Sequence, residues 1–556
     1  MVEPAGEEHT GHVDTFSADH LPAPELWPRR NWDGIAELAY PPRFNSATEL
    51  LRATLEASGG ERPAIRFPGG AWSYRELDER SNRIAHVLVD DFGVVPGNRV
   101  LLRGANTPGL AACWLGVLKA GGVAVCTMAM LRERELQYIA EKAEISLALT
   151  DARVAEDCEA AIRAHGNGTG GGRGGGACVV RFGGAGAADL DALMQDKPST
   201  FAPCDTAAED VAIIAFTSGT TGQGKGTMHS HRDILAITDC FPRYVLKPTV
   251  DDLFCGSPPL AFTYALGGLL LFPLRFGACT LLLEQASPPH LLKAIEEHRP
   301  TVCFTAPTAY RAMCGMLATE THDVSSLRRC VSAGETLPRS VFDAWLTATG
   351  LRIIDGIGAT ELLHIFISAS DDDIRPGSTG RVVPGYEACI LDNDGNAVPD
   401  GTVGRLAVRG PTGCRYLDNE ARQREYVQNG WNVTGDSYMR DADGYFWYQA
   451  RTDDIIISSG YNIAGPEVEN VLLEHPAVQE CAVIGMPDEE RGQLVTAFVV
   501  LRGDQEGSAP LVKELQDFVK ARIAPYKYPR AVNFVGELPR TTTGKLQRFR
   551  LREAAR

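Results

Sequence analysis

Residues 211–226 read VAIIAFTSGTTGQGKG, an apolar run followed by a loop of glycines and hydroxyl residues with a single lysine. The six apolar residues at 211–216 are typical of a strand that is buried on both faces. The loop behind them suits phosphate, because glycines let backbone N–H groups converge on an anion while hydroxyls and Lys225 add donors and charge. The stretch therefore predicts an α/β protein in which a buried strand carries a phosphate-binding loop.

Two kinds of nucleotide-binding loop compete for this stretch. Residues 219–225, GTTGQGK, match the start of the P-loop motif GxxxxGK, which continues with a Ser or Thr that binds magnesium. Here Gly226 takes that place and Thr227 comes one residue late. A P-loop also leaves the TSGTT cluster at 217–221 unexplained. A P-loop NTPase remains an alternative, and it predicts ADP and phosphate as products.

Five further motifs follow the loop along the chain. They are DGIGATE at 355–361, GRLAVRG at 404–410, WNVTGD at 431–436, ARTDDIIISSGYNIAGPE at 450–467 and LPRTTTGK at 538–545. All six, in this order, resemble the signature motifs of the acyl-adenylate-forming superfamily, which includes acyl-CoA synthetases, peptide-synthetase adenylation domains and firefly luciferase. The chain departs from the usual pattern at four positions: Gly224 replaces a proline, Ile357 an aromatic residue, Ala450 a glycine and Ser458 a lysine.

The resemblance implies an α/β fold with a large multi-subdomain N-terminal domain at 1–449. That domain holds two αβα-type subdomains and a small β-barrel-like subdomain at about 380–449. A hinge at 450–454 and a small mobile α+β C-terminal lid domain at 455–556 complete the predicted chain. The residue patterns agree with this implied fold, since helical and β-rich runs alternate early in the chain, while 380–448 is rich in short strands and turns.

Composition excludes several classes of function. A chain of 556 residues is too long for one hydrophobic core, and its net charge of −17 argues against nucleic acid and anionic membranes as partners. The longest apolar stretches are interrupted by Lys119 or too short to span a bilayer, and no signal peptide is visible. Fourteen scattered cysteines are typical of a reduced, cytoplasmic protein. His229 and His231 lack further ligands at zinc spacing.

Two glycine-rich or polar segments are expected to carry no chemistry. Residues 166–176, GNGTGGGRGGG, predict a flexible surface insertion, because no strand leads into them and no GK[ST] follows. Residues 1–12 are expected to be disordered.

The chemistry of adenylation points to particular residues. A carboxylate must attack the α-phosphorus of ATP, so two anions must meet, and positive charge is needed at that point. By the resemblance, Lys545 contacts the acid and the α-phosphate, Thr360 binds the α-phosphate and Glu361 binds Mg²⁺, a cation suited to carboxylate and phosphate oxygens. The alternatives are a solvated surface lysine at 545 and a helix N-cap at Thr360 and Glu361. Loss of these residues would indicate a non-catalytic relative.

The rest of the ATP site, the hinge and the thiol tunnel follow from the same resemblance. Asp436 and Arg451 take the ribose hydroxyls, Asp453 is the hinge residue, and Gly460 lines the tunnel for the pantetheine of coenzyme A. The complete predicted ATP site is Thr217, Ser218, Gly219, Thr220, Thr221, Gly222, Lys225, Gly334, Glu335, Asp355, Gly356, Asp436 and Arg451.

The acid substrate is expected to be a small aromatic carboxylic acid. Residues 355–366, DGIGATELLHIF, resemble benzoate– and 2-aminobenzoate–CoA ligases, and the segments at 12–16 and 45–51 resemble 2-aminobenzoate–CoA ligases in particular. The implied pocket consists of Phe262, Thr263, Tyr264, Ala333, Gly358, His364 and Ile365. Small residues at 333 and 358 suit a flat ring. His364 either binds an ortho amino or hydroxyl group or is simply a buried histidine.

The predicted reaction joins 2-aminobenzoate to coenzyme A with ATP, releasing AMP and pyrophosphate. Benzoate or salicylate is the alternative acid, and a carrier-protein phosphopantetheine acting in trans is the alternative acceptor. A monomer and a homodimer both fit the sequence, which decides neither the pathway nor the effect of Gly224.

Overall fold

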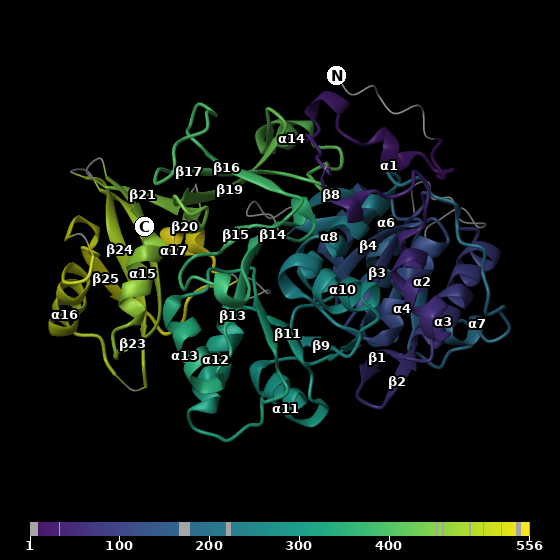
Figure 1. Cartoon of the computed structure of the whole chain (residues 1–556), viewed down its shortest axis with the longest axis horizontal. Helices are drawn as coiled ribbons and strands as arrows, with labels where there is room; N and C mark the ends of the chain where they lie inside the picture. Colours follow the sequence, from purple (N-terminus) through teal and green to yellow (C-terminus); the bar gives the residue numbers. More distant parts are fainter. Residues whose placement is uncertain are drawn as a thin grey trace.

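The computed structural model describes residues 9–32, 34–165, 178–217, 224–451, 454–458, 461–488, 491–503, 505–523, 525–540 and 546–554. Figure 1 shows two neighbouring α/β layers, a β-rich part above them, and a smaller unit at the carboxyl end beside helices α12 (Pro307–Leu317) and α13 (Arg339–Thr349). The structure is mixed α/β with a large N-terminal part and a small C-terminal part, which confirms the predicted fold class.

The 211–226 stretch forms two strands at the edge of a six-stranded sheet. The sheet order is β6-β5-β3-β4-β7-β8, parallel except for the antiparallel pair β7 and β8. The strands are β3 (Arg99–Gly104), β4 (Val123–Met128), β5 (Leu147–Asp151), β6 (Cys178–Phe182), β7 (Val211–Thr217) and β8 (Lys225–Ser230). The first five residues of β7 are buried, as the apolar run predicts. Thr217 and Lys225 pair in register, so they frame the segment that joins the two strands.

Helices pack against this sheet and against one another. Helices α4 (Pro108–Lys119), α6 (Ala155–His165) and α8 (His231–Asp239) contact its strands, α5 (Glu133–Lys142) packs against α6, and α2 (Ser46–Ser58) and α3 (Tyr74–His86) pack against α4. Helix α3 begins at a capping box in which Ser73 and Glu76 bond each other's backbone N–H groups, which satisfies two of the donors at its first turn. Helix α8 begins in the same way at Ser230 and Asp233.

The second sheet has nine strands in the order β15-β14-β13-β12-β11-β9-β10-β1-β2. They are β1 (Pro63–Phe67), β2 (Gly70–Ser73), β9 (Leu253–Gly256), β10 (Cys279–Leu281), β11 (Val302–Thr305), β12 (Arg329–Ser332), β13 (Ile353–Gly358), β14 (Ile365–Ser368) and β15 (Arg381–Val382). The neighbours from β1 to β13 are parallel. Ligands of open parallel sheets bind at the carboxyl ends of the strands, and the predicted site segments after β9, β12 and β13 lie there.

Two smaller sheets complete the chain, the first antiparallel and the second mixed. The β-rich part comprises β16 (Glu387–Leu391), β17 (Val403–Arg409), β18 (Val427–Gln428), β19 (Trp431–Arg440) and β20 (Phe446–Arg451). The C-terminal part comprises β21 (Ile455–Ser458), β22 (Tyr461–Ala464), β23 (Val478–Asp488), β24 (Gly492–Leu501) and β25 (Ala531–Phe534) with α15 (Gly465–Leu473), α16 (Ala509–Lys520) and α17 (Arg548–Ala554). The residue boundaries of the domains and hinge stay predictions.

The apolar cores separate the small part from the rest. One large cluster includes Leu102 of the six-stranded sheet, Phe254 of the nine-stranded sheet and Leu406 of the β-rich part. The C-terminal part has its own cluster, which includes Ile456 and Leu515. The large part therefore folds around a shared core, whereas the small part is stabilised by a core of its own.

The prediction that residues 1–12 are disordered needs a correction. The Gly11 N–H donates to Asp210 Oδ2 at 2.8 Å, and the Thr10 hydroxyl also bonds Asp210. Residues 9–12 are therefore held against the segment before β7, and the prediction of disorder is wrong for them. Residues 1–8 and the glycine-rich insertion lie outside the described residues.

Candidate active site

A short 3-10 turn, η7 (Thr360–Leu362), follows β13 and carries two of the predicted catalytic residues. Each of its three residues is held by a side chain from another segment. Thr360 O accepts from His229 Nε2 at 2.8 Å, Glu361 Oε1 accepts from the Tyr416 hydroxyl at 2.6 Å, and Leu362 O accepts from the Thr412 hydroxyl at 2.8 Å. Thr360 is the first residue of the turn and not its cap, which argues against the N-cap alternative.

Backbone strain marks the end of this turn. Leu363 is fully buried and has a φ of +69°, in the left-handed region that costs a non-glycine residue about 1–2 kcal/mol. The buried Leu363 side chain and the three hydrogen bonds to the turn hold that conformation in place. The surroundings therefore fix the position of Thr360 and Glu361 before any ligand binds.

Lys225, at the start of β8, faces the same region as Glu361. Burial lowers the pKa of Lys225, the Arg422 guanidinium lowers it further, and the Glu361 carboxylate acts in the opposite direction. Glu361 accepts the Tyr416 hydroxyl at Oε1, and among the described residues no hydrogen bond uses Oε2, so Oε2 suits a cation. A carboxylate with one such oxygen, close to a lysine that suits phosphate, fits the predicted Mg²⁺–nucleotide site.

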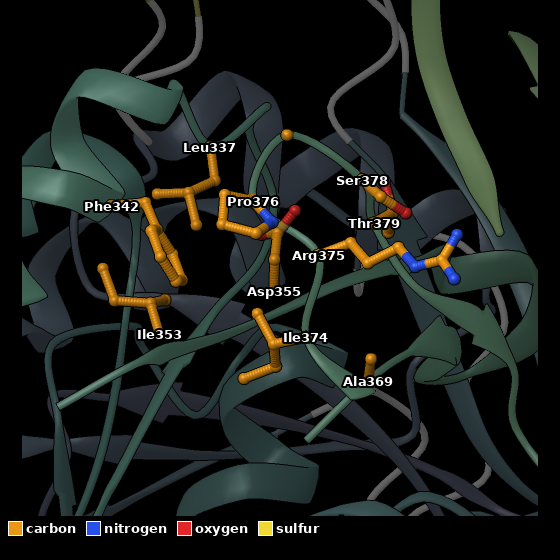
Figure 2. Close-up of a pocket in the computed structure, with 11 residues that line it drawn as sticks. Leu337, Phe342, Ile353, Asp355, Ala369, Ile374, Arg375, Pro376, Ser378 and Thr379 are labelled. Atoms are coloured by element: carbon orange, nitrogen blue, oxygen red, sulfur yellow. The ribbon is translucent and has the colours of Figure 1, made fainter. Parts of the chain in front are cut away.

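Asp355 of β13 is partly buried, and no charged group of the described residues pairs with its carboxylate. Burial raises its pKa to about 7, against a smaller opposing effect of Ser332. Within the described part of the chain, neither Asp355 Oδ1 nor the Ser332 hydroxyl has a hydrogen-bond partner of good geometry. Figure 2 shows Asp355 beside Pro376 in a small pocket, with the Arg375 guanidinium directed away from it. The arrangement leaves an acceptor available to a ligand that donates hydrogen bonds.

The loop after β12 meets the C-terminal part of the chain. Gly334 has a φ of +87°, which favours glycine there. Burial raises the pKa of Glu335, and the Arg540 guanidinium, with Nη1 3.8 Å from Glu335 Oε1, opposes that shift. Arg540 also donates to Glu480 at 2.8 Å. Arg540 therefore links the C-terminal part to the predicted ATP-binding loop.

The two residues predicted to bind ribose lie opposite each other. Asp436 of β19 and Arg451 of β20 are register partners, and Arg451 Nη1 donates to Asp436 Oδ1 at 3.1 Å. The TGD segment that carries Asp436 lies inside β19, where Gly435 has a φ of +77°. The glycine and the nearby irregularity in the β19–β20 register bend the strand at this point.

The predicted acid pocket is brought together at the carboxyl ends of β12 and β13. His364 Nε2 donates to the Tyr264 carbonyl at 3.2 Å, and the rings of Tyr264 and His364 are 5.8 Å apart. The Tyr264 hydroxyl donates to the carbonyl of Val331, two residues before Ala333. Of the other predicted residues, Thr263, Ala333 and Ile365 are buried, and Phe262 is partly exposed just before helix α9 (Thr263–Ala265).

Two glycines give this pocket its close packing. A Cβ on Gly358 would lie 2.8 Å from the backbone of His364, and one on Gly356 would lie 2.9 Å from the Ile365 side chain. Backbone atoms cannot move aside as a flexible side chain can, so position 358 accepts only glycine in this conformation. Its lack of a side chain brings β13 close to His364.

Burial also determines the protonation state of His364. It lowers the pKa of His364 to about 3, although the hydrogen bond to the Tyr264 carbonyl acts against this. The imidazole is therefore neutral at ordinary pH. Because a carbonyl only accepts, the proton is on Nε2 and the lone pair is on Nδ1. Within the described ranges, Nδ1 is buried without a partner.

Eight predicted residues lie outside the described residues. They are Ser218, Gly219, Thr220, Thr221 and Gly222 of the phosphate loop, Asp453 of the hinge, Gly460 of the tunnel, and Lys545. Their roles stay predictions. Three residues around the catalytic turn, His229, Tyr416 and Thr412, were not predicted to belong to the site. Their contacts join residues 50 to 131 positions apart, so no local pattern signals them.

Two further findings concern function classes. In the described ranges, no group of three or more His, Cys, Asp and Glu residues is arranged to hold a metal ion. No helix in the same ranges is both long enough and apolar enough to cross a membrane.

The chain matches two families of known proteins. It matches the family described as AMP-binding enzyme over residues 51–415, and the AMP-binding enzyme C-terminal domain over residues 467–545. The benzoate–CoA ligase of Thauera aromatica is 34% identical over 522 residues, which cover 92% of this chain and 97% of the ligase.

Solved structures agree with the family matches. The anthranilate CoA ligase AuaEII in complex with anthranoyl-AMP is similar with a TM-score of 0.86 and 34% identity, over 94% of this chain and 99% of that one. A benzoate CoA ligase from Burkholderia xenovorans LB400 has a TM-score of 0.81 and 33% identity, over 92% of this chain and 100% of that one.

These matches confirm the prediction of an enzyme of the acid–thiol ligase class, and they extend the resemblance from six motifs to nearly the whole chain. The chain belongs to the AMP-binding enzymes, the acyl-adenylate-forming superfamily.

Proposed function

We propose that this protein is an ATP-dependent aryl-acid–CoA ligase that converts 2-aminobenzoate, ATP and CoA to 2-aminobenzoyl-CoA, AMP and pyrophosphate through an acyl-adenylate. One observation carries the proposal: Gly358 and His364, which pack closely against each other, flank the Thr360–Glu361 turn. A flat acid bound beside these two residues would have its carboxylate next to the residues that suit the α-phosphate. The names of two similar proteins, a benzoate and an anthranilate CoA ligase, support an aromatic acid.

The first half-reaction needs two anions to approach each other. The Thr360 hydroxyl and the Lys225 ammonium are suited to bind the phosphates, and the residue proposed to contact both the acid and the α-phosphate is Lys545. Mg²⁺, when bound at Glu361, would neutralise phosphate charge. Glu361 needs no rearrangement for this, because Tyr416 already holds its other oxygen. The contribution of the chain is therefore positioning and charge.

The nucleoside of ATP has fitting partners in the same region. The exocyclic amine of adenine donates hydrogen bonds, and Asp355 Oδ1, which has no partner among the described residues, is suited to receive one. Asp436 and Arg451 offer an acceptor and a donor for the ribose hydroxyls.

The choice of 2-aminobenzoate rests on the lone pair of His364 Nδ1. Benzoate offers no donor to this atom. The single phenolic hydrogen of salicylate bonds to the neighbouring carboxylate of salicylate itself, whereas an ortho amino group has a second N–H that remains free to donate. His364 Nδ1 has no partner among the described residues, so a hydrogen bond to it favours 2-aminobenzoate over both alternatives.

The second half-reaction transfers the acyl group to a thiol. We place coenzyme A there, with Gly460 leaving room for the pantetheine arm and the lid of residues 455–556 rotating about Asp453 between the two steps. The separate core of the C-terminal part supports such rotation as a rigid unit. A carrier-protein phosphopantetheine is the alternative thiol.

The deciding experiment measures turnover of 2-aminobenzoate, benzoate, salicylate and aliphatic acids with ATP and CoA. We expect AMP, pyrophosphate and an aryl-CoA thioester, with the highest kcat/KM for 2-aminobenzoate. A higher kcat/KM for an aliphatic acid would contradict the aryl assignment. Adenylate formation without a CoA thioester, together with loading of a carrier protein, would replace the proposed thiol. ADP and phosphate as products would point to the P-loop alternative.

A further inference from the structure

His229 lies fully buried on β8, one residue before the Ser230 cap of α8, and neither the acid nor the nucleotide is assigned to it. Its Nε2 is 2.8 Å from the Thr360 carbonyl oxygen. Since that oxygen only accepts, Nε2 carries a proton and donates it to the turn. The other ring nitrogen, Nδ1, lies 3.7 Å from Asp233 Oδ2. The imidazole thus stands between the catalytic turn and a buried carboxylate.

That carboxylate belongs to a rigid ionic cluster. Asp233 is fully buried and pairs with Arg415 at 2.9 Å and with Arg30 at 3.1 Å, and it accepts the Ser230 N–H at 2.9 Å. Arg30 also pairs with Glu209 at 2.7 Å. The two arginines hold the pKa of Asp233 well below its usual value, against the effect of burial. A carboxylate that two arginines and a backbone N–H hold in the interior is a fixed point against which a ring can be held.

The same cluster also leads to Glu361. Arg415 precedes Tyr416, whose hydroxyl donates to Glu361, and the segment at 415–417 is hydrogen-bonded to β8 through Met228 N–H to Arg415 O and Leu417 N–H to Gly226 O, both at 2.8 Å. His229 and Tyr416 therefore lie on neighbouring segments of the chain, and they form hydrogen bonds to two consecutive residues of the turn. Lys225 begins the same strand β8, four residues before His229.

We propose that His229 is a positioning residue for adenylation: its Nε2–H fixes the Thr360 carbonyl, so that the Thr360 hydroxyl and the Glu361 carboxylate face the phosphates. This inference rests on the proposed function, because it assumes that the turn acts on ATP. Without the bond, the strained turn that ends at Leu363 is held at fewer points and shifts away from Lys225. A misplacement of about 1 Å at such a site can cost about 100-fold in rate.

The test compares His229→Gln with His229→Asn. The Gln amide nitrogen reaches the position of Nε2 and can still donate to Thr360, whereas the Asn amide nitrogen reaches only the position of Nδ1. Both side chains are polar and neutral, so a difference between the variants reports the bond to the turn. His231→Gln is the matched control, since His231 is equally buried, lies two residues away and bonds Ser46 instead.

Two half-reactions are measured for each variant with whichever acid the parent protein activates best. The first is acid-dependent ATP–pyrophosphate exchange, and the second is thioester formation from the isolated acyl-adenylate and CoA. We expect H229N to lower the exchange rate about 10- to 100-fold and to need more Mg²⁺, H229Q and the control to stay within about threefold, and thioester formation to change by less than about threefold.

Each other outcome has a definite meaning. Equal exchange rates in H229Q and H229N, or equal losses in both half-reactions, would overturn the positioning role and leave a structural one. If the parent protein catalyses pyrophosphate exchange with aliphatic but not with aryl acids, the proposed substrate is wrong. The comparison of the two variants still decides the role of His229 in that case. Absence of exchange with every acid would overturn both proposals.

Discussion

At the scale of single residues, protonation of Asp355 should change the free energy of unfolding with pH. Its pKa in the folded protein is raised to about 7 by burial, so the native state keeps a proton that the unfolded chain releases above its ordinary pKa. The stabilisation is complete below about pH 4, and it is lost as the pH rises toward about 7.

Replacement of Asp355 by Asn should therefore raise the melting temperature at pH 8 and change it little at pH 4.5. The amide keeps the shape of the carboxyl group and removes a charge whose burial costs up to roughly 4 kcal/mol. The measurement is thermal unfolding of parent and variant at both pH values. A difference between the two proteins that does not depend on pH would show that Asp355 is not the titrating group.

His364 allows a prediction about substrate choice. His364→Phe keeps an aromatic ring of similar size and removes the Nδ1 acceptor, so the kcat/KM ratio of 2-aminobenzoate to benzoate should fall about tenfold. Steady-state kinetics with both acids measures the ratio, and benzoate is the internal control for folding. If kcat/KM falls by the same factor for both acids, the histidine packs the pocket without selecting the ortho group.

The residues that the sequence could and could not predict differ in one physical respect. Asp355, Thr360 and Glu361 belong to a contiguous motif, so their chemistry and spacing are visible in the chain itself. His229 and Tyr416 contact the same turn, but only because β8, the segment at 415–417 and the end of β13 meet in space. Such contacts depend on tertiary packing, which a pattern of neighbouring residues does not contain.

At the scale of elements, the β7–β8 hairpin shows why the absence of the family proline at position 224 matters. A Cβ at Gly224 would lie 2.9 Å from the Thr217 carbonyl oxygen, and the Gly224 carbonyl accepts from the Tyr138 hydroxyl at 3.0 Å. The Thr217 backbone on one side and the Tyr138 hydroxyl on the other restrict any shift. Replacing proline by glycine raises the entropy of the unfolded loop, whereas the geometry at the end of the loop favours a residue without a side chain.

Gly224→Pro should consequently fail to improve ATP binding. Proline would lower the entropy of the unfolded chain by an amount worth about 0.4–1 kcal/mol, but the contact with Thr217 forces the hairpin apart. We expect the KM for ATP to rise about three- to tenfold while the KM for the acid changes less. Gly224→Ala isolates the steric part, since it adds the Cβ alone. A lower KM for ATP in the proline variant would mean that loop entropy outweighs the contact.

The presence of a strand or helix is easier to predict from the sequence than the residues at which it begins and ends. The apolar runs near 99–103, 123–127 and 147–150 are strands because burial on both faces selects continuous apolar residues. The TGD segment, which in isolation is typical of a hairpin turn, is instead the interior of β19, because Gly435 bends a strand that continues to Arg440. Pairing with β17 and β20 decides this.

At the scale of the whole molecule, two parts with separate cores share an ion pair across their boundary. Arg548 of α17 donates to Glu469 of α15, and Arg552 bonds Asp454, so the last helix ties the C-terminal part together and contacts the last residue of the proposed hinge. Across the boundary, Arg540 contacts Glu335. An interface of this polar kind can be broken and re-formed at small cost, which the proposed rotation requires.

The contact between Arg540 and Glu335 should therefore matter in one half-reaction only. Arg540 lies five residues before Lys545 and, in this arrangement, beside the loop proposed to bind ATP, so the pair should persist during adenylation and separate when the lid rotates. A double-mutant cycle of Arg540→Ala and Glu335→Gln should give a coupling of about 0.5–1 kcal/mol, two- to fivefold in rate, for pyrophosphate exchange. For thioester formation from the isolated adenylate it should give none.

Arg540 also supplies the control for that cycle. Its second partner, Glu480, lies within the C-terminal part, so a cycle of Arg540→Ala with Glu480→Gln should show the same coupling in both half-reactions. Equal coupling between Arg540 and Glu335 in the two steps would mean that the lid keeps one orientation throughout. Rotation about residue 453 would then be excluded even if adenylation and thioester formation both proceed, because the two parts would never lose this contact.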